Sequence, residues 1–184
     1  MNVITQQSIA SGLFQILSII YPDIILAGGA PRDWWFDRPA SDLDFYAHGV
    51  SLSTLPTIAL AGNNLKLCTD VYGDVAEEMG VDKTYNFIYK NTPVQLMNVN
   101  KPVDPDKLIN SMSTGLSKSW FDKDMRHHRS AEFNFCILTK QIVIKPNTYK
   151  PHLDKIKGKF PGWTMISERE ALDQMLQKWY VGGR

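Results

Sequence analysis

The stretch from Ile25 to Tyr46, ILAGGAPRDWWFDRPASDLDFY, decides the fold expected for this chain. Its apolar start, together with the residues before it, predicts a buried strand over residues 23–27 that stops at two glycines. Gly28 and Gly29 carry no Cβ, so the backbone can turn sharply there and lie close to a ligand. The stretch therefore predicts a strand followed by a tight turn.

The second half of the stretch predicts a short helix and another strand. Pro31 is favoured in the first turn of a helix, which predicts a helix over residues 31–36. The N-terminus of a helix offers unpaired N–H groups and a partial positive charge, both suited to a phosphate. A strand over residues 42–47 follows, and alternation along it places Asp42 and Asp44 on one face.

Asp42 and Asp44 form a candidate metal site. Two neighbouring carboxylates repel each other unless a cation lies between them, and Mg²⁺ prefers oxygen ligands of this kind. A phosphate-binding turn beside two carboxylates suits metal-assisted transfer of a phosphoryl or nucleotidyl group. For Asp-x-Asp alone, a solvated acidic strand end is the better explanation, but the sequence GGAPRD upstream favours the metal site.

Three short motifs within this stretch resemble a known family. They are Gly28-Gly29-Ala30-Pro31-Arg32-Asp33, Arg38-Pro39 and Asp42-Leu43-Asp44. Together they resemble the head motif of the DNA polymerase β-like nucleotidyltransferase superfamily, with CCA-adding enzymes and bacterial poly(A) polymerases as the closest version. Short phage-encoded proteins with this head motif are similar in size and layout.

The resemblance implies an α+β fold, with a mixed β-sheet flanked by helices. It also implies an NTP donor and two Mg²⁺ ions, or Mn²⁺ in their place. Asp42 and Asp44 would be the catalytic metal ligands. The nucleotide-binding residues that it implies are Gly28, Gly29, Arg32, Asp33 and Arg38.

The superfamily usually supplies a third carboxylate from a later strand, and this chain departs from that pattern. The corresponding segment is Thr92-Pro93-Val94-Gln95-Leu96-Met97, in which Gln95 takes the acidic position. A neutral amide can ligate a metal through its carbonyl oxygen, but it does not offset the charge of two divalent ions. Asp70 and Asp74 are possible substitutes, at other places in the sequence.

Two functions therefore stay open. The first is a nucleotidyltransferase that moves an NMP from an NTP to an acceptor hydroxyl on an RNA 3′ end, a protein or a small molecule. The alternative is a catalytically degenerate scaffold, such as a phage-encoded one, that binds a partner as a regulator or inhibitor. A nucleotide-binding sensor without turnover lies between them. Lys118, Trp120 and Phe121 are further candidates for lining a nucleotide site.

Composition sets broad limits. A chain of 184 residues, 43% hydrophobic and 21% charged, predicts one globular domain over residues 1–184. We expect no segment long and apolar enough to span a membrane, no secretory signal and no membrane partner. Cys68 and Cys136 are too few for a disulfide framework and are expected to be buried thiols. These features together predict a cytoplasmic protein of a bacterial cell or a phage-infected host.

Charge is distributed unevenly along the chain. Residues 1–115, the head-like core, hold 7 Lys+Arg and 12 Asp+Glu, whereas residues 116–184 hold 13 and 7. The basic C-terminal part contains Arg126-His127-His128-Arg129 and lysines at 150, 155, 157 and 159. Such a surface can hold RNA by its phosphates, or a protein partner with an acidic surface. A solvated helix face is the plainer explanation.

The remaining elements follow from periodicity and turn residues. We expect helices over 4–20, 74–79, 104–112, 149–160 and 167–180, the last begun by a capping box of Ser167 and Glu170. Strands are expected over 65–70 and 117–122, with a hairpin of 84–89 and 93–99. A second, C-terminal β-hairpin is expected from 132–138 and 141–144, followed by the two closing helices.

Overall fold

The computed structural model describes residues 1–55, 66–68 and 79–181, and it divides into two compact units. Unit 1 comprises residues 1–111 and 119–128, and unit 2 comprises residues 112–118 and 129–184. Whether the two units form the single domain expected from the sequence, with a boundary near residue 115, stays a prediction.

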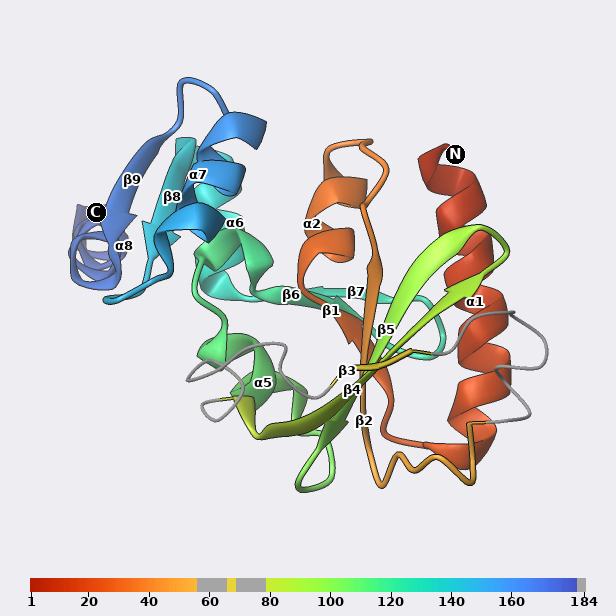
Figure 1. The fold of residues 1–184 in the computed structure, drawn as a ribbon. Coiled ribbons are helices and arrows are strands. Elements are labelled where there is room, and N and C mark those ends of the chain that lie inside the picture. Colours follow the sequence, from red (N-terminus) through yellow and green to blue (C-terminus); the bar gives the residue numbers. More distant parts are fainter. Residues whose placement is uncertain (56–65, 69–78, 182–184) are drawn as a thin grey trace. The chain divides into compact units, whose positions relative to one another are not determined.

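Unit 1 is built on a seven-stranded mixed sheet in the order β3-β4-β5-β2-β1-β6-β7 (Figure 1). β2 and β5 are parallel, whereas β1 pairs antiparallel with both β2 and β6. β4 and β5 form a long antiparallel hairpin at the turn Lys90-Asn91, where both residues have positive φ. The strands are β1 (Ile25–Ala27), β2 (Leu43–His48), β3 (Lys66–Cys68), β4 (Val81–Tyr89), β5 (Thr92–Val99), β6 (Ser119–Phe121) and β7 (His127–Arg129).

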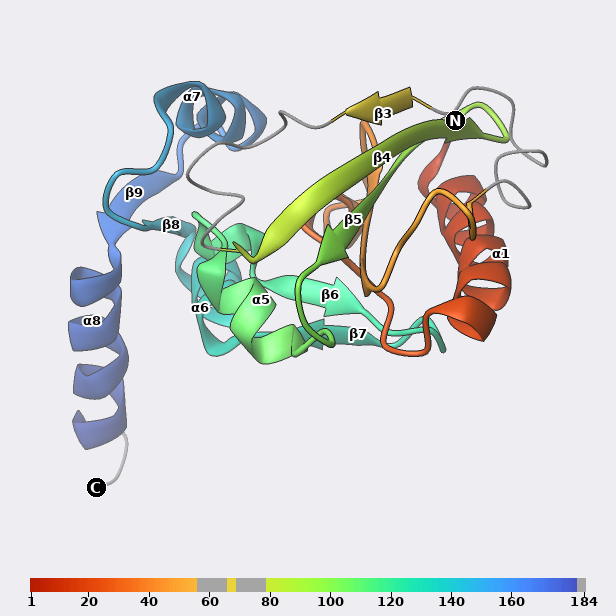
Figure 2. The ribbon, with the colours of Figure 1, turned by 60° about the horizontal axis from the view of Figure 1, so that its bottom comes forward.

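The hydrophobic core of unit 1 lies between one face of this sheet and helices α1 (Val3–Ile20) and α2 (Gly29–Trp35). Leu13, Phe14 and Leu17 of α1 are fully buried, and the Phe14 ring packs edge-on against Phe45 of β2, 5.0 Å between ring centroids. Helix α5 (Pro105–Ser111) lies beside β6 (Figure 2). Every second side chain of β2, including Leu43 and Phe45, therefore points into this core.

A buried glutamine ties α1 to the segment that leads into β2. The Gln6 side chain accepts hydrogen bonds from Trp34 Nε1 (3.0 Å) and the Ala40 N–H (2.8 Å), and donates one to the Ala40 carbonyl (2.8 Å). Because buried polar groups are costly when unpaired, these three bonds hold the end of α2 and the loop before Asp42 in place.

Unit 2 is a separate small α/β assembly. Strands β8 (Gln141–Ile144) and β9 (Thr164–Ser167) pair in parallel, joined by helix α7 (Lys150–Lys159). Its other elements are the 3₁₀ turn η1 (Gly115–Ser117) and the helices α6 (Ala131–Thr139) and α8 (Glu168–Val181). Lys118 is buried here, with its ammonium 2.5 Å from Glu132 Oε2 and 3.1 Å from Glu168 Oε1.

The expected C-terminal β-hairpin is wrong. Residues 131–139 form α6, and β8 pairs with β9. Ser130 caps the helix by accepting a hydrogen bond from the Phe133 N–H (3.0 Å), and Lys140 ends it in the left-handed conformation. The alternation of Phe133 and Phe135 is typical of a strand, but the capping at both ends favours a helix.

Most other expected elements are confirmed, and with them the α+β class and the mixed sheet flanked by helices. The capping box of α8 is present: the Glu170 carboxylate accepts from the Ser167 N–H, and Ser167 Oγ accepts from the Glu170 N–H. The expected helix over 74–79 and the candidates Asp70 and Asp74 lie outside the described residues, apart from position 79.

The expectation that no segment could span a membrane is wrong for α1. By length and composition alone, this helix of 18 residues, Val3–Ile20, is long and apolar enough to cross a membrane. In unit 1, α1 buries Leu13, Phe14 and Leu17 in the core. The apolar residues of this helix are therefore used, in part, for packing within the protein.

We predict that Phe14→Ala lowers the free energy of unfolding by about 3–5 kcal/mol, because it removes a fully buried ring from the contact between α1 and β2. Urea denaturation followed by circular dichroism measures this. The matched control is Ile19→Ala on the same helix, where the side chain is 83% exposed and a change within about 0.5 kcal/mol is expected. Equal losses for the two variants would contradict the packing described.

We also predict that Cys136 reacts slowly with thiol reagents in the folded protein. Burial raises the pKa of its thiol to about 11, so only about one molecule in a thousand carries the reactive thiolate at pH 8. Labelling with a chromogenic disulfide, in a Cys68→Ser background, should be slow in buffer and fast in urea. Fast labelling without denaturant would show that unit 2 does not bury this residue.

Candidate functional site

Strand register places Asp44 at the centre of a row of residues across the sheet. Asp44 of β2 lies opposite Gln95 of β5 on one side and opposite Ala27 of β1 on the other. Gln95 in turn lies opposite Asn86 of β4. Because residues in register point to the same face of a sheet, the Asp44 carboxylate and the two amides share one face.

This face is the one opposite the core shared with α1. Leu43 and Phe45, which flank Asp44, are completely buried on the core face, whereas Asp44 is only partly buried. Asp42 precedes β2 by one residue, is also partly buried, and accepts a hydrogen bond from Ser41 Oγ (2.9 Å). Alternation along the extended chain therefore brings Asp42 and Asp44 to one face, as the sequence predicts.

Gly28 lies directly against the Asp44 carboxylate. A Cβ at position 28 would lie 3.0 Å from Asp44 Oδ2, and the residue has φ +83° and ψ −125°. The backbone conformation strains any side chain at this position, and a Cβ would also force the Asp44 carboxylate to shift. The turn from β1 into α2 therefore passes close to the Asp44 carboxylate.

Gly29 begins α2, and the Arg32 side chain folds back toward it. Arg32 Nη2 lies 3.5 Å from the position of a Cβ on Gly29. The same side chain donates from Nε to Asp33 Oδ1 (2.9 Å), and both residues are almost completely buried. A buried charge pair of this kind is costly to break, so it fixes the guanidinium beside the glycine turn.

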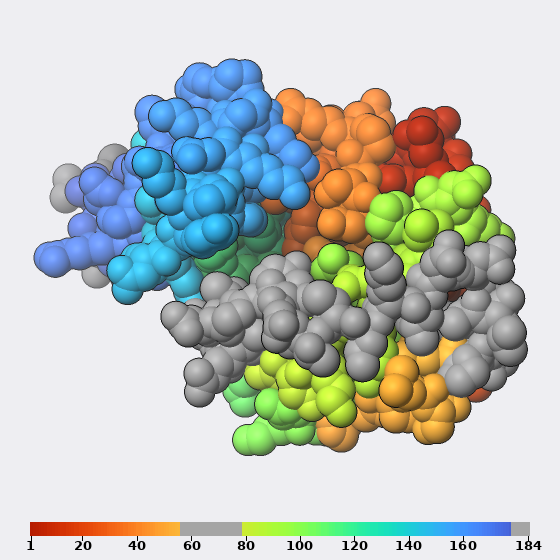
Figure 3. Space-filling model, in the orientation of Figure 1, coloured from red at the N-terminus to blue at the C-terminus, as the bar shows by residue number. Residues whose placement is uncertain are grey.

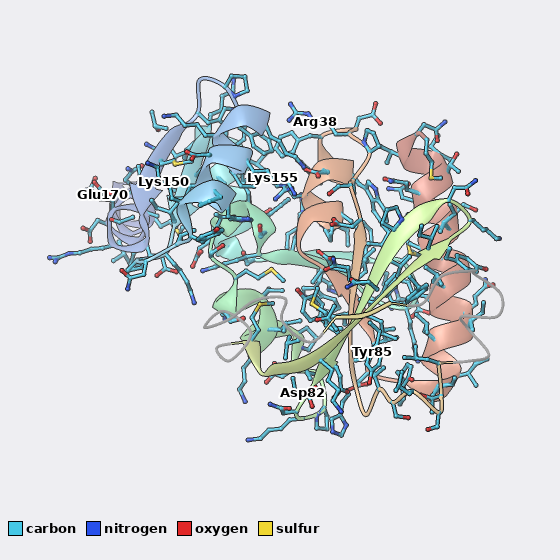
Figure 4. All side chains as sticks on the ribbon, in the orientation of Figure 1. Arg38, Asp82, Tyr85, Lys150, Lys155 and Glu170 are labelled. Atoms are coloured by element: carbon cyan, nitrogen blue, oxygen red, sulfur yellow. The ribbon has the colours of Figure 1, made fainter. Side chains whose placement is uncertain are left out.

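Arg38 lies away from this group. It is exposed in the loop that follows α2, at the helix end opposite the glycine turn, with its guanidinium carbon 5.8 Å from the centre of the Phe36 ring (Figure 4). The structure thus brings Gly28, Gly29, Arg32, Asp42, Asp44 and Gln95 into one region, while Arg38 lies at the other end of the helix. A nucleotide-binding role for Arg38 stays a prediction.

The donor set fits one Mg²⁺ ion better than two. Asp42 and Asp44 are carboxylates, but the neighbour of Asp44 across the parallel pair is the neutral Gln95. Mg²⁺ is commonly held by one or two protein carboxylates together with substrate phosphates. Among the residues that the structure describes, no three His, Cys, Asp or Glu side chains converge on one metal position.

Two residues in the row that contains Asp44 were not predicted from the sequence, or were only weakly indicated by it. They are Asn86 and Trp120. Asn86 was not singled out, because its place beside Gln95 depends on the register of the β4–β5 hairpin. Trp120 of β6 lies opposite Ala27, in the same row as Asp44. Of the other weak candidates, Phe121 faces the core and packs near Trp34, and Lys118 is paired with Glu132 and Glu168 inside unit 2.

Comparison with known sequences gives no assignment. No protein-family model matches the chain, and no curated protein matches it.

Comparison with solved structures gives several matches of low identity. A tRNA-processing enzyme in an apo form has a TM-score of 0.63 and 13% identity, over 95% of this chain and 47% of that one. A CCA-adding enzyme in complex with CTP has a TM-score of 0.53 and 11% identity, over 88% and 40% of the two chains. The Thermotoga maritima CCA-adding enzyme complexed with tRNA has a TM-score of 0.55 and 11% identity, over 88% and 39%.

This chain spans less than half the length of those enzymes. At such identities the likeness establishes the fold alone. The chain therefore has the nucleotidyltransferase fold, in the form found in the heads of CCA-adding enzymes.

Proposed function

We propose that the protein is a Mg²⁺-dependent nucleotidyltransferase, which moves an NMP from an NTP to an acceptor hydroxyl. The observation that carries this proposal is the close approach of Gly28 to the Asp44 carboxylate, on the sheet face that Asp42 shares. Within a nucleotidyltransferase fold, this joins a turn suited to phosphates with two metal-ligating carboxylates.

Each residue of the site has a role in the proposed reaction. The turn at Gly28 and Gly29 lets the backbone lie against the triphosphate, and the fixed guanidinium of Arg32 adds positive charge beside it. Asp42 and Asp44 would hold Mg²⁺, which when bound supplies charge neutralisation at the reacting phosphate. The acceptor oxygen forms its bond to the α-phosphorus as the bond to pyrophosphate breaks, and positioning supplies the catalysis.

An RNA 3′ end is the acceptor class that we favour. The solved structures that share the fold include complexes with CTP and with tRNA. In unit 2, Lys150, Lys155 and Lys157 of α7 are exposed, and the surface of this helix is visible in Figure 3. Figure 4 shows two of these lysines, Lys150 and Lys155, on the helix. Such lysines can bind RNA phosphates without recognising a particular sequence. The cytoplasm of a bacterial or phage-infected cell is the location that we propose for this reaction.

One observation favours a second function, a catalytically degenerate scaffold that regulates or inhibits a partner. Gln95 occupies the strand position beside Asp44 where the resemblance leads us to expect a third carboxylate. A scaffold of this kind would keep the fold and the glycine turn without transferring a nucleotide. Substitution of Gln95 separates the two functions.

We predict that Asp42→Asn and Asp44→Asn each abolish nucleotide transfer, because each removes a charged metal ligand while keeping the side-chain shape. The assay incubates the protein with each α-³²P-labelled NTP, Mg²⁺ or Mn²⁺, total RNA and cell lysate. The wild type should transfer label to an RNA or protein acceptor, and the two site variants should not. The control variant Asp106→Asn, which changes an exposed carboxylate on α5, should transfer label like the wild type. Label that both site variants still transfer would contradict the assignment of this site.

We further predict that Gln95→Glu tightens the binding of Mg²⁺ or Mn²⁺ by roughly tenfold or more, because it adds a negative charge beside Asp44. Isothermal titration with Mn²⁺ in the presence of NTP measures the binding, and the labelling assay measures transfer. The nucleotidyltransferase proposal expects transfer from the wild type at lower metal affinity. A wild type and a Gln95→Glu variant that are both folded and both inactive would favour the scaffold.

A further inference from the structure

The row of residues that contains Asp44 continues to an aromatic pair at the edge of the sheet. Ala27 of β1 lies opposite Asp44 on one side and opposite Trp120 of β6 on the other. The β6–β7 hairpin then places His128 opposite Trp120, because the Asp122 N–H donates to the Arg126 carbonyl and the Ser130 N–H donates to the Lys118 carbonyl. Trp120 and His128 therefore share the face of Asp44.

The two rings stack closely. Their centroids are 3.9 Å apart and their planes differ by only 10°. Trp120 is partly exposed, although its neighbours Ser119 and Phe121 are buried, and the His128 side chain is 40% exposed. The pair lies on the face away from the α1 core, so packing in that core does not explain the arrangement.

A carboxylate holds the histidine ring in this position. His128 Nε2 lies 2.9 Å from Asp122 Oδ2, and the other oxygen of Asp122 accepts from the N–H groups of Asp124 (3.0 Å) and Arg126 (2.9 Å). Burial alone would raise the pKa of this carboxyl. The hydrogen bonds from His128 and from the backbone outweigh that effect and hold the pKa below its usual value. Asp122 is therefore ionised at neutral pH and keeps His128 flat against Trp120.

His128 stacks on one face of the indole, and the neighbour of Trp120 on the other side of the row is Ala27 of β1. Ala27 contributes only a methyl group, so no larger side chain of β1 stands in the row between Trp120 and Asp44. Two strand spacings separate the backbones of these two residues, about 10 Å. In a nucleotide, the ribose lies between the base and the α-phosphate, as Ala27 lies between Trp120 and Asp44.

We propose that Trp120 is a stacking platform for a nucleobase, with His128 and Asp122 as positioning residues behind it. The inference rests on the proposed function, since it places the phosphate of the same nucleotide, or the 3′ end that attacks it, at Asp42 and Asp44. Aromatic side chains bind bases by stacking in a way that tolerates any base. The base belongs either to the NTP donor or to the last nucleotide of an RNA acceptor.

Binding measurements with ligands that have or lack a base test this platform. Equilibrium dialysis in Mg²⁺ compares ATP and CTP with inorganic triphosphate. A second arm compares an RNA oligonucleotide that ends in a 3′ adenosine with the same oligonucleotide ending in an abasic residue. We expect Trp120→Ala to weaken binding of the base-containing ligand of one arm by roughly 5- to 150-fold, and to leave its base-free partner unchanged. The arm that responds identifies the source of the base.

Four further variants keep the result interpretable. Trp120→Tyr retains an aromatic face and should bind nearly as well as the wild type. Trp35→Ala is the matched control, because Trp35 lies near His127, whose ring packs against Phe121 on the core face of the same hairpin. His128→Ala should weaken base-dependent binding less than Trp120→Ala, and His128→Phe should restore it. Thermal unfolding of each variant shows that it is folded.

Several outcomes would overturn the platform. An equal loss for base-containing and base-free ligands would mean that Trp120 acts only through the structure. Unchanged binding of every ligand by a folded Trp120→Ala protein would overturn the platform and leave the proposed function standing. A wild type that binds neither NTP, triphosphate nor RNA would overturn both together.

Discussion

The site depends on the contact between the Gly28 backbone and the Asp44 carboxylate. A Cβ at position 28 would lie 3.0 Å from Asp44 Oδ2, and the positive φ of this residue also requires glycine. This approach fixes where α2 begins relative to β2. It also brings the buried Arg32–Asp33 pair beside the turn, and Gln6 holds the loop that returns from α2 toward Asp42. The likeness to CCA-adding enzymes establishes the fold, and this close approach marks the place within it where we propose that the reaction occurs.

Register across the sheet then decides which groups share that place. The parallel pairing of β2 with β5 places Gln95, rather than a carboxylate, beside Asp44, and the β4–β5 hairpin adds Asn86 next to it. On the other side, Ala27 separates Asp44 from Trp120. One row thus carries neutral amides toward one edge and an aromatic pair toward the other. Among the described residues of this row the carboxylate comes from Asp44, and Asp42 lies two residues before it on the same face. Two carboxylates suit a single divalent ion held together with substrate phosphates.

The sequence predicted what depends on local pattern. Alternation around Leu43 and Phe45 was enough to predict which face of β2 holds the two carboxylates, and glycine chemistry predicted the turn before α2. Pairing between distant segments cannot be derived from local pattern, so neither the position of Asn86 beside Gln95 nor the strand β9 was predicted. The strand expected over residues 132–138 is part of a helix, because the alternation of Phe133 and Phe135 is also compatible with a strand whereas the Ser130 cap favours the helix. The inward pairing of Arg32 with Asp33 is likewise a tertiary feature, because burial decides it.

The most direct test of the account is a crystal structure of the protein with Mn²⁺ and a non-hydrolysable NTP analogue, in which the anomalous signal locates the ion. The account predicts Mn²⁺ in coordination distance of Asp42 and Asp44, with the triphosphate against the turn at Gly28 and Gly29. A nucleotide bound elsewhere on the protein, or an ion that does not touch these carboxylates, would contradict the assignment of this face as the site of transfer.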